Sequence, residues 1–527
     1  MILSSRLGLG TVITHVGLLR TCFRYLANAG WIALMAVMQG CGSGDSPDVP
    51  PQPPIPPDPP ASRSPDVRPN IILFLTDDQP LGYEAALPFT QRYIFERGVS
   101  FDESFVSTSL CCPSRSSLLT GQYTHNHGVL SNAGRGGADD FHRLGGEART
   151  LGTLLQSAGY RTGFIGKYLN QYPGESELAA VYVPVGWDEW VAAVDIYPTI
   201  LPYGQFDYTL IENGQAVRYG NADRDYFSDV VTSKAADFVS NALSSGQPFF
   251  VIVAYISPHA PAEAPLRHRG YFRSTAAPRG ASFNEADVSD KPAWLSSKPL
   301  LDTHTTEQLA ETHRRMLRSL ISVDEGVRRI VELVADRNQL DRTFFVFTSD
   351  NGLHLGEHRI ANDKNTPYEE AIRVPLGIIG PGTGRGVKRT EMVVNIDLAP
   401  TILELANIPI PAYMDGRSLV PLLEADSPTP STWRQRFLLE HYAPYAGEGL
   451  NIDPRPNRLE YVGVRTRDHV YVEYAYGDFE LYDLLVDPNQ LENIYYRADP
   501  SLLSALRQHL EELRLCAGSE CVEAEDR

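Results

Sequence analysis

The chain has 527 residues and a formal net charge of −19. Its length exceeds that of one ordinary domain and suits a large α/β enzyme with a smaller appended domain. The acidic balance, without basic runs, argues against a nucleic-acid-binding protein. Six cysteines in so long a chain exclude a dense disulfide framework. An acidic protein that handles an anionic substrate must gather Lys, Arg and His at one place, so we look for such a cluster.

The first 41 residues have the pattern of a secretory signal peptide. Arg20 and Arg24 precede an apolar stretch, 27–38, that is too short for a transmembrane helix. The segment ends at Cys41, as in bacterial lipoprotein signals whose cysteine carries the lipid, although Gln39 stands where a small residue is usual. We therefore expect export to the periplasm or cell surface, with a lipid anchor or a simple signal peptide as the two alternatives.

Residues 42–67 are predicted to be a proline-rich linker. The stretch from Ser46 to Pro60 holds so many prolines that it can neither continue a helix nor pair within a sheet. An extended spacer is expected, and a tether between a lipid anchor and a catalytic domain would explain it.

Four apolar runs are predicted to be strands buried on both faces of a sheet. The runs and the polar residues after them are 70–76 with Asp77 and Asp78, 161–165 with Lys167, 249–254 with His259, and 343–348 with Asp350 and Asn351. Helices are expected between them at 150–158, 227–243, 305–335 and 397–405. This alternation indicates a doubly wound α/β fold with a mostly parallel sheet. Ligands bind beyond the carboxyl ends of such strands, so these polar side chains should meet at one site.

The acidic members of this set suit a divalent cation. Asp77, Asp78, Asp350 and Asn351 all offer oxygen ligands, which favour Ca²⁺ or Mg²⁺ over zinc. Neighbouring carboxylates would repel one another strongly unless a cation lay among them.

The segment from Cys111 to Gly121 carries the candidate nucleophile. Pro113 suits the first turn of a helix, whose N-terminal amides would favour an anion, and Arg115 adds a cationic fork. A zinc half-site and a redox pair are alternatives for Cys111 and Cys112. Adjacent cysteines are poorly placed to chelate one metal, so an anion-binding nucleophile site is favoured.

This segment resembles the signature of the type I, formylglycine-dependent sulfatases, Cys-x-Pro-Ser-Arg followed by Thr-Gly. The chain is most similar to the branch of N-acetylglucosamine-6-sulfatases and extracellular heparan sulfatases. The likeness extends from about Arg68 to the C-terminus and includes 76–78, 111–121, 166–170, 186–190, 257–259, 348–352, Asp363, Lys364, Tyr368, Glu369 and 373–375.

The resemblance implies an alkaline-phosphatase-like catalytic domain at 68–425 and an antiparallel subdomain at 426–527. It implies that a maturation enzyme oxidises Cys111 to formylglycine. It also implies that Ca²⁺ is bound by Asp77, Asp78, Asp350, Asn351 and the converted Cys111. The catalytic residues would be Cys111, Arg115, Lys167, His259 and Lys364, acting on a sulfated sugar or an aryl sulfate. His259 or Lys364 would protonate the leaving oxygen.

One position departs from the pattern of many sulfatases, which carry a histidine two residues after the active-site lysine. Here that position is Leu169, so the base for sulfate release has no assigned residue. His127 is one candidate, and a structural role for it is equally open. We expect structural roles for His354 and His358.

The C-terminal part is predicted to contain short strands at 461–465, 469–474 and 479–483 and a helix at 500–515. Cys516 and Cys521 could bridge a short loop in an exported protein, or could be two free thiols. Two rival functions are kept: a formylglycine-dependent phosphonate or phosphate ester hydrolase, and a non-catalytic surface binding protein.

Overall fold

The computed structural model describes residues 48–62, 68–133, 136–174, 180–196, 199–424, 432–443 and 458–527. Residues Ser46–Arg527 form one compact unit. The expected signal peptide, Cys41 and the flanking parts of the linker, 42–47 and 63–67, lie outside the described residues.

A ten-stranded sheet forms the centre of the described chain. In sheet order its strands are β11 (Val387–Arg389), β2 (Val99–Phe101), β10 (Leu376–Ile379), β9 (Thr343–Ser349), β1 (Asn70–Asp77), β8 (Phe249–Pro258), β4 (Arg161–Gly166), β5 (Glu189–Ala193), β6 (Thr209–Glu212) and β7 (Gln215–Arg218). The five strands from β9 to β5 are parallel to one another, whereas β10, β6 and β7 run antiparallel to their neighbours. The predicted mostly parallel sheet is confirmed, and its four predicted strands are neighbours at its centre.

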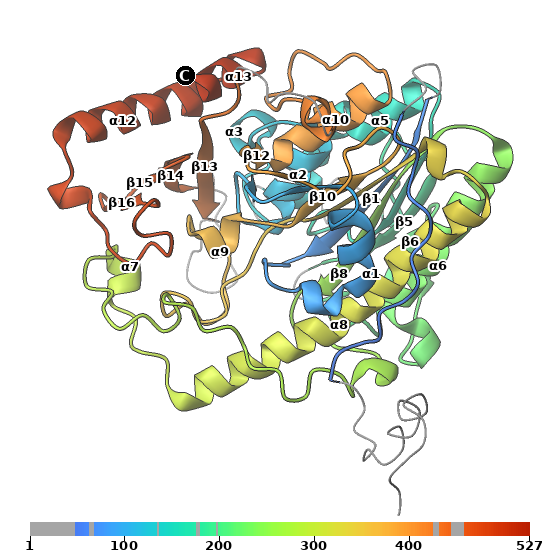
Figure 1. Ribbon diagram of the computed structural model, residues 1–527, viewed down its shortest axis with the longest axis horizontal. Helices are drawn as coiled ribbons and strands as arrows, with labels where there is room; N and C mark the ends of the chain where they lie inside the picture. The colour runs from blue at the N-terminus through green and yellow to red at the C-terminus, as the bar shows by residue number, and fades with distance from the viewer. Residues whose placement is uncertain are drawn as a thin grey trace, which may run out of the picture. The chain divides into compact units, whose positions relative to one another are not determined.

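Helices cover both faces of this sheet (Figure 1). One face packs on α6 (Phe227–Ser245), α8 (Thr303–Asp336) and α1 (Pro88–Thr90), which contact Ile72 and Phe74 of β1 through one buried cluster. The other face packs on α2 (Cys111–Thr120), α4 (Gly137–Arg143), α5 (Leu151–Ser157) and α10 (Leu398–Leu405), around Ile71, Leu73 and Leu75. Consecutive side chains of β1 thus enter opposite cores, which explains its continuous apolar sequence. Short segments complete this part: α3 (Thr124–His127), α7 (Ala293–Ser296), α9 (Glu369–Ile372), α11 (Val420–Leu423), and the paired strands β3 (Ser104–Phe105) and β12 (Val393–Val394).

A second, antiparallel sheet follows in the C-terminal part. Its order is β13 (Arg436–Ala443), β14 (Arg458–Thr466), β15 (His469–Tyr474) and β16 (Phe479–Asp483). Helix α12 (Pro500–Leu515) packs Leu506, Leu510 and Leu513 against it (Figure 1). The three predicted strands and the helix are confirmed. Strand β13 was not predicted, and neither was the last helix, α13 (Ser519–Asp526).

A disulfide joins Cys516 to Cys521, so the bridged alternative is confirmed. It connects the end of α12 to α13, where Glu525 lies buried and pairs with Arg434 at 2.9 Å and Arg417 at 2.8 Å. The last residues of the chain are therefore tied into the core by a covalent bond and by buried ion pairs.

Residues 48–62 of the proline-rich segment lie against the surface of the folded unit and do not form a free spacer. Arg92 Nη1 donates to the carbonyl of Pro53, and Arg97 Nη1 donates to that of Pro56, each at 2.8 Å. Asp58 pairs with Arg97 and Arg385, each at 2.9 Å. An extended proline-rich chain leaves its carbonyls unpaired, so arginines of a folded surface can bind it along its length.

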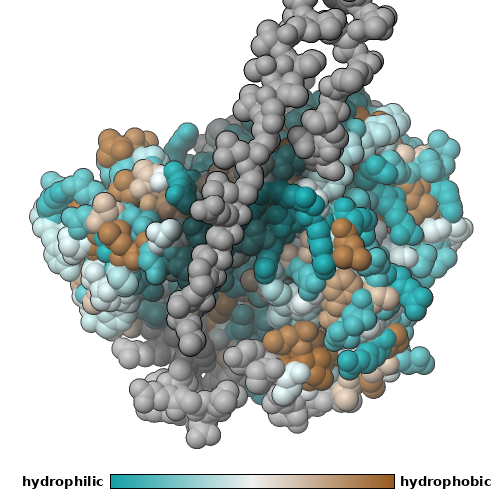
Figure 2. All heavy atoms as spheres, turned by 90° about the horizontal axis from the view of Figure 1, so that it is seen from below, coloured by the Kyte–Doolittle hydropathy of each residue, from teal (hydrophilic) through white to brown (hydrophobic). Residues whose placement is uncertain are grey.

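The face of the molecule in Figure 2 is mostly hydrophilic where the described residues form it, and its apolar side chains occur in separate groups. None of the helices within the described residues is long and apolar enough to cross a membrane.

Candidate active site

The carboxyl ends of the central strands bring the predicted site residues together. In the β1–β9 pair, Thr76 lies opposite Ser349, so Asp77 and Asp350 leave the sheet at the same edge. Lys167 follows β4, and its backbone N–H donates to Ala254 of β8 at 2.9 Å. His259 follows β8 directly. Side chains that are far apart in sequence therefore share one edge of the sheet, as expected for a doubly wound fold.

Gly166 permits the close approach of β4 and β8 before Lys167. Its φ is +123°, and a Cβ at this position would lie 1.8 Å from the carbonyl oxygen of Ala254. Only glycine tolerates this backbone conformation and this contact. The glycine in the Gly-Lys pair therefore sets the position from which the lysine reaches the site.

Helix α2 begins at Cys111, which is 1% exposed. Its Sγ lies 3.6 Å from Oδ1 of Asp77 and 3.9 Å from Oδ1 of Asp78. Pro113 stands in the first turn, as predicted. Cys111 therefore faces the strand ends from the first residue of the helix.

Two buried cations and one partly buried cation pair with the carboxylates of this cluster. Arg115 Nε donates to Asp350 Oδ2 at 2.7 Å, and Lys167 Nζ donates to Asp77 Oδ2 at 2.6 Å. Lys364 Nζ lies 2.8 Å from Cys111 Sγ and also pairs with Asp78. The acidic chain therefore gathers three cations at the cysteine, where they face the carboxylates of Asp77, Asp78 and Asp350 and can also contact an anionic substrate.

Burial and charge act in opposite directions on the carboxylates. Burial alone would raise the pKa of Asp77, but Lys167, His259 and Arg115 outweigh it and hold the pKa below its usual value. The same balance, with Lys364 as the main cation, lowers the pKa of Asp78. Both groups are therefore ionised near neutral pH.

The residues present fit a hard divalent cation. Ligand atoms of Asp77, Asp78, Cys111 and His259 all lie within 4.8 Å of one another. Asn351 Nδ2 donates to Asp78 Oδ1 at 2.7 Å, whereas its Oδ1 is buried without a hydrogen-bond partner among the described residues. Asp350 Oδ1 accepts from the Asp78 backbone N–H at 3.1 Å. An orphaned amide oxygen beside ionised carboxylates is the donor set that Ca²⁺ prefers.

The unmodified thiol of Cys111 is a poor nucleophile in this setting. Burial raises its pKa to about 12 despite Lys167 and Lys364, so the thiol stays protonated near neutral pH. Cys112 is also buried and is absent from the candidate metal group. These findings disfavour the zinc half-site and the redox pair.

His259 stands at the more open side of the cluster, and its side chain is 23% exposed. Its Nδ1 lies 2.7 Å from the carbonyl oxygen of Ala260, so this nitrogen carries a proton. Its Nε2 faces the site, 3.5 Å from Asp78 Oδ2. The ring of Tyr203 stacks on the imidazole, and sequence analysis did not find this residue. No motif marks Tyr203, because its role depends on a loop that the chain folds over the strand ends.

The other candidate histidines form hydrogen bonds with residues outside this cluster. Nδ1 of His127 accepts from the backbone N–H of Val129, and its Nε2 contacts Ser117 Oγ at 3.0 Å. His354 contacts Thr366, and His358 contacts Glu285. Leu169 is 1% exposed in the apolar core, so this position provides no proton acceptor.

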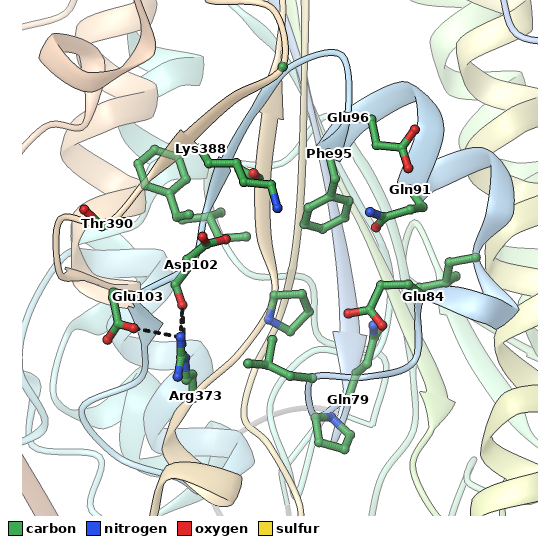
Figure 3. A pocket seen from close by; sticks show the side chains of 18 residues that line it. Gln79, Glu84, Gln91, Phe95, Glu96, Asp102, Glu103, Arg373, Lys388 and Thr390 are labelled. Carbon is green, nitrogen blue, oxygen red and sulfur yellow. Dashed lines mark hydrogen bonds and ion pairs between the residues drawn. The ribbon is translucent and has the colours of Figure 1, made fainter. Parts of the chain in front are cut away.

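A cavity of about 750 Å³ opens elsewhere, between β2, β11 and the segment after β1 (Figure 3). Glu84, Glu96, Asp102 and Glu103 line it together with Lys388 and with Arg373, which is paired with Glu103 at 2.7 Å. Four carboxylates against two cations give this lining a net negative charge, which disfavours an anionic substrate such as a sulfate ester. None of the predicted catalytic residues lines the cavity.

Comparison with protein families matches the Sulfatase family over residues 69–408. The chain belongs to the sulfatase family. A second match, to the C-terminal part of N-sulphoglucosamine sulphohydrolases, covers residues 356–515. The sulfatase is thus a sulfuric ester hydrolase.

Curated relatives match most of the sulfatase. Human N-acetylglucosamine-6-sulfatase is 34% identical over 487 residues, which cover 86% of each chain. A Sulf-1 extracellular sulfatase homologue from Caenorhabditis elegans is 39% identical over 390 residues, or 71% of this chain. The match covers 53% of that relative, so the chain spans about half of its length.

Solved structures support the same fold. One, described in complex with its substrate D-glucosamine-2-N,6-O-disulfate, superimposes with a TM-score of 0.70 at 25% identity and covers 87% of the sulfatase and 99% of that chain. A phosphonate monoester hydrolase of Agrobacterium radiobacter gives a TM-score of 0.64 at 20% identity, with 85% and 95% covered. The alkaline-phosphatase-like fold is confirmed, with a large, mostly parallel sheet and a separate small antiparallel sheet.

Proposed function

We propose that this sulfatase removes the 6-O-sulfate from glucosamine or N-acetylglucosamine units of sulfated saccharides. The observation that carries the proposal is the match to N-acetylglucosamine-6-sulfatase over 86% of both chains. The solved relative that binds a glucosamine disulfate supports the same substrate class. The cationic cluster at Cys111 gives the charge that a sulfate ester requires.

The proposed chemistry uses Cys111 after its conversion to formylglycine by a maturation enzyme. The hydrated aldehyde would supply a hydroxyl nucleophile and a second hydroxyl whose deprotonation releases sulfate. A serine could attack but could not release sulfate in this way. The placement of Cys111 at the first residue of α2, beside Lys364 and Asp77, supports this role.

The remaining proposed catalytic side chains bind the sulfate group and transfer one proton to the leaving alcohol. Arg115, Lys167 and Lys364 would bind the sulfate oxygens and stabilise the charge that grows on them. Nη2 of Arg115 is buried without a hydrogen-bond partner among the described residues and lies 3.9 Å from Asp77 Oδ1, so it could still donate to a sulfate oxygen. His259 faces the more open side of the cluster and would act as the acid with both ring nitrogens protonated, Nδ1 toward the carbonyl of Ala260 and Nε2 toward the leaving oxygen. The Nε2 proton would then pass to the leaving alcohol.

The proposed metal is Ca²⁺, held by Asp77, Asp78, Asp350, Asn351 and the converted Cys111. When bound, it would lower the pKa of the nucleophilic hydroxyl and polarise the sulfate. The chain itself holds these ionised carboxylates close together, because Lys167 pairs with Asp77 and Lys364 pairs with Asp78, which offsets their repulsion.

The proposal also covers location and domain organisation. Relatives named as extracellular sulfatases support export. A lipid anchor at Cys41 and a boundary between catalytic domain and C-terminal subdomain near residue 425 remain parts of the proposal.

The test combines mass spectrometry with a substrate panel, on protein made in a host that has the maturation enzyme. The peptide carrying Cys111 should contain an aldehyde, and N-acetylglucosamine-6-sulfate should be hydrolysed faster than galactose-6-sulfate. Cys111→Ser should abolish turnover while the fold persists. An unmodified thiol with no turnover would instead support the non-catalytic binding protein. Preference for phosphonate monoesters would support the rival hydrolase, whose fold this chain shares.

A further inference from the structure

Tyr203 is in contact with two of the proposed catalytic groups. Its ring stacks on the imidazole of His259, with 4.2 Å between ring centroids and 24° between planes. The ammonium of Lys167 lies 4.9 Å from the centre of the same ring. The ammonium of Lys167 is already held by Asp77 at 2.6 Å, so the ring contributes mainly to the position of the imidazole.

The tyrosine is itself fixed by two buried polar groups. Its hydroxyl donates to Asp195 Oδ2 at 2.6 Å, and Asp195 is 3% exposed. Asn170 Nδ2 donates to the same carboxylate oxygen at 3.1 Å and to the Tyr203 hydroxyl at 3.0 Å. Hydrogen bonds to a buried carboxylate are strong, so Asp195 and Asn170 restrict rotation of the phenol.

His259 has few other restraints. Its Nδ1 bonds to the carbonyl of the next residue, which is local and fixes only one edge of the ring. Nε2 lies 3.5 Å from Asp78 Oδ2, and among the described residues Asp77 and Cys111 also have ligand atoms within 4.8 Å of the imidazole, but neither forms a hydrogen bond with it. The orientation of Nε2 toward a leaving oxygen therefore depends on the stack with Tyr203.

We propose that Tyr203, anchored by Asp195 and Asn170, is a positioning residue that holds His259 as proton donor to the leaving alcohol. The proposal rests on the proposed function, in which His259 is the acid. Asn170 follows the position where Leu169 replaces the histidine of many sulfatases. In this chain Asn170, the residue after Leu169, thus helps to hold the proton donor His259 in place through Asp195 and Tyr203.

A proton donor matters most when the leaving group is a strong base, so the test varies the leaving group. Tyr203→Leu removes the ring, and kcat should fall by about 10²-fold on N-acetylglucosamine-6-sulfate, whose alcohol leaves poorly. On 4-nitrophenyl sulfate, whose phenolate leaves easily, kcat should fall less than about five-fold. Across phenyl sulfates from 4-nitrophenol to unsubstituted phenol, the loss should grow with the basicity of the leaving group.

Three further variants make the result specific. Tyr203→Phe keeps the ring and should show a smaller loss of kcat than Tyr203→Leu. The double variant Tyr203→Leu/His259→Ala should be no slower than His259→Ala, because the tyrosine acts through the histidine. The matched control is Tyr219→Leu. Tyr219 also stacks on a ring, that of Tyr208, and donates to a carboxylate, Glu212, but contacts no catalytic residue.

The proposal would be overturned if Tyr203→Leu lowered kcat equally on all substrates. It would also be overturned if the losses of kcat caused by Tyr203→Leu and His259→Ala multiplied in the double variant. Circular dichroism must show that each variant is folded. If the wild type cleaves phenyl sulfates but not the sugar sulfate, the proposed substrate fails while the phenol series still tests Tyr203. The two failures are therefore distinguishable.

Discussion

The ammonium of Lys364 lies 2.8 Å from Sγ of Cys111. These residues come from a loop after β9 and from the first turn of α2, and Lys364 also pairs with Asp78. One cation therefore contacts both the nucleophile position and a carboxylate of the proposed metal site. Any sulfate oxygen that replaces the thiol contact would meet the same ammonium group.

Replacement of this lysine should impair turnover. Lys364→Ala should lower kcat by about 10²- to 10³-fold, the usual cost of losing one charge-stabilising donor. Steady-state kinetics on 4-nitrophenyl sulfate would measure it. Lys388→Ala, an exposed lysine of the edge strand β11, should keep wild-type activity. Equal effects of the two substitutions would contradict the assigned role.

Calcium removal should inactivate the enzyme reversibly. Chelation would leave the carboxylates of Asp77, Asp78 and Asp350 without the proposed cation, and added Ca²⁺ should restore turnover. At 100 times its dissociation constant, bound Ca²⁺ should stabilise the fold by about 2.7 kcal/mol, visible as a rise in Tm.

Asp78→Asn should reduce this calcium-dependent rise in Tm, whereas Asp341→Asn, on an exposed turn, should leave it unchanged. A rise in Tm that is the same in both variants would place the ion elsewhere.

The stability of the fold should depend on the buried ion pairs that hold the C-terminal helix α13. Arg434 is buried and bonds to Asp397 at 2.7 Å and to Glu525 of α13 at 2.9 Å. Arg434→Met leaves two buried carboxylates without this partner and should cost about 3–5 kcal/mol of unfolding free energy. Urea denaturation would measure it. Arg497→Met, which removes an exposed pair with Glu492, should cost at most about 1 kcal/mol. A loss for Arg434→Met as small as that of the control would refute the prediction.

The proline-rich segment should be held by arginines. A spin label on Gln52→Cys, at an exposed position of the segment, should be immobilised in the otherwise wild-type protein. Arg97→Ala/Arg385→Ala removes the pairs with Asp58 and should release it, with a narrower electron paramagnetic resonance spectrum. Arg224→Ala, on an exposed turn, is the control. An unchanged spectrum in the double variant would show that other contacts hold the segment.

Much of the fold could be predicted from sequence because its central strands are buried on both faces. Strands β1, β4, β8 and β9 are continuous apolar runs, and this pattern depends only on burial. Strand β13 lacks the pattern, since Arg436, Glu440 and His441 are buried in it through polar partners. Such partners come from other elements, so the local sequence does not reveal them.

The motifs along the chain already indicate which residue types the site contains. Cys111, Arg115, Lys167, His259 and Lys364 stand in motifs whose order is readable along the chain, and their chemistry suits an anion. How these side chains come together depends on the topology of the sheet and on the loops packed against it. The parallel pairing of β1 with β8 and β9 brings the carboxylates and the histidine to one edge. The stack of Tyr203 on His259 and the arginine contacts of residues 48–62 also arise only when distant segments pack together. Contacts of this kind depend on the shape of the whole fold, which no local pattern of residues encodes.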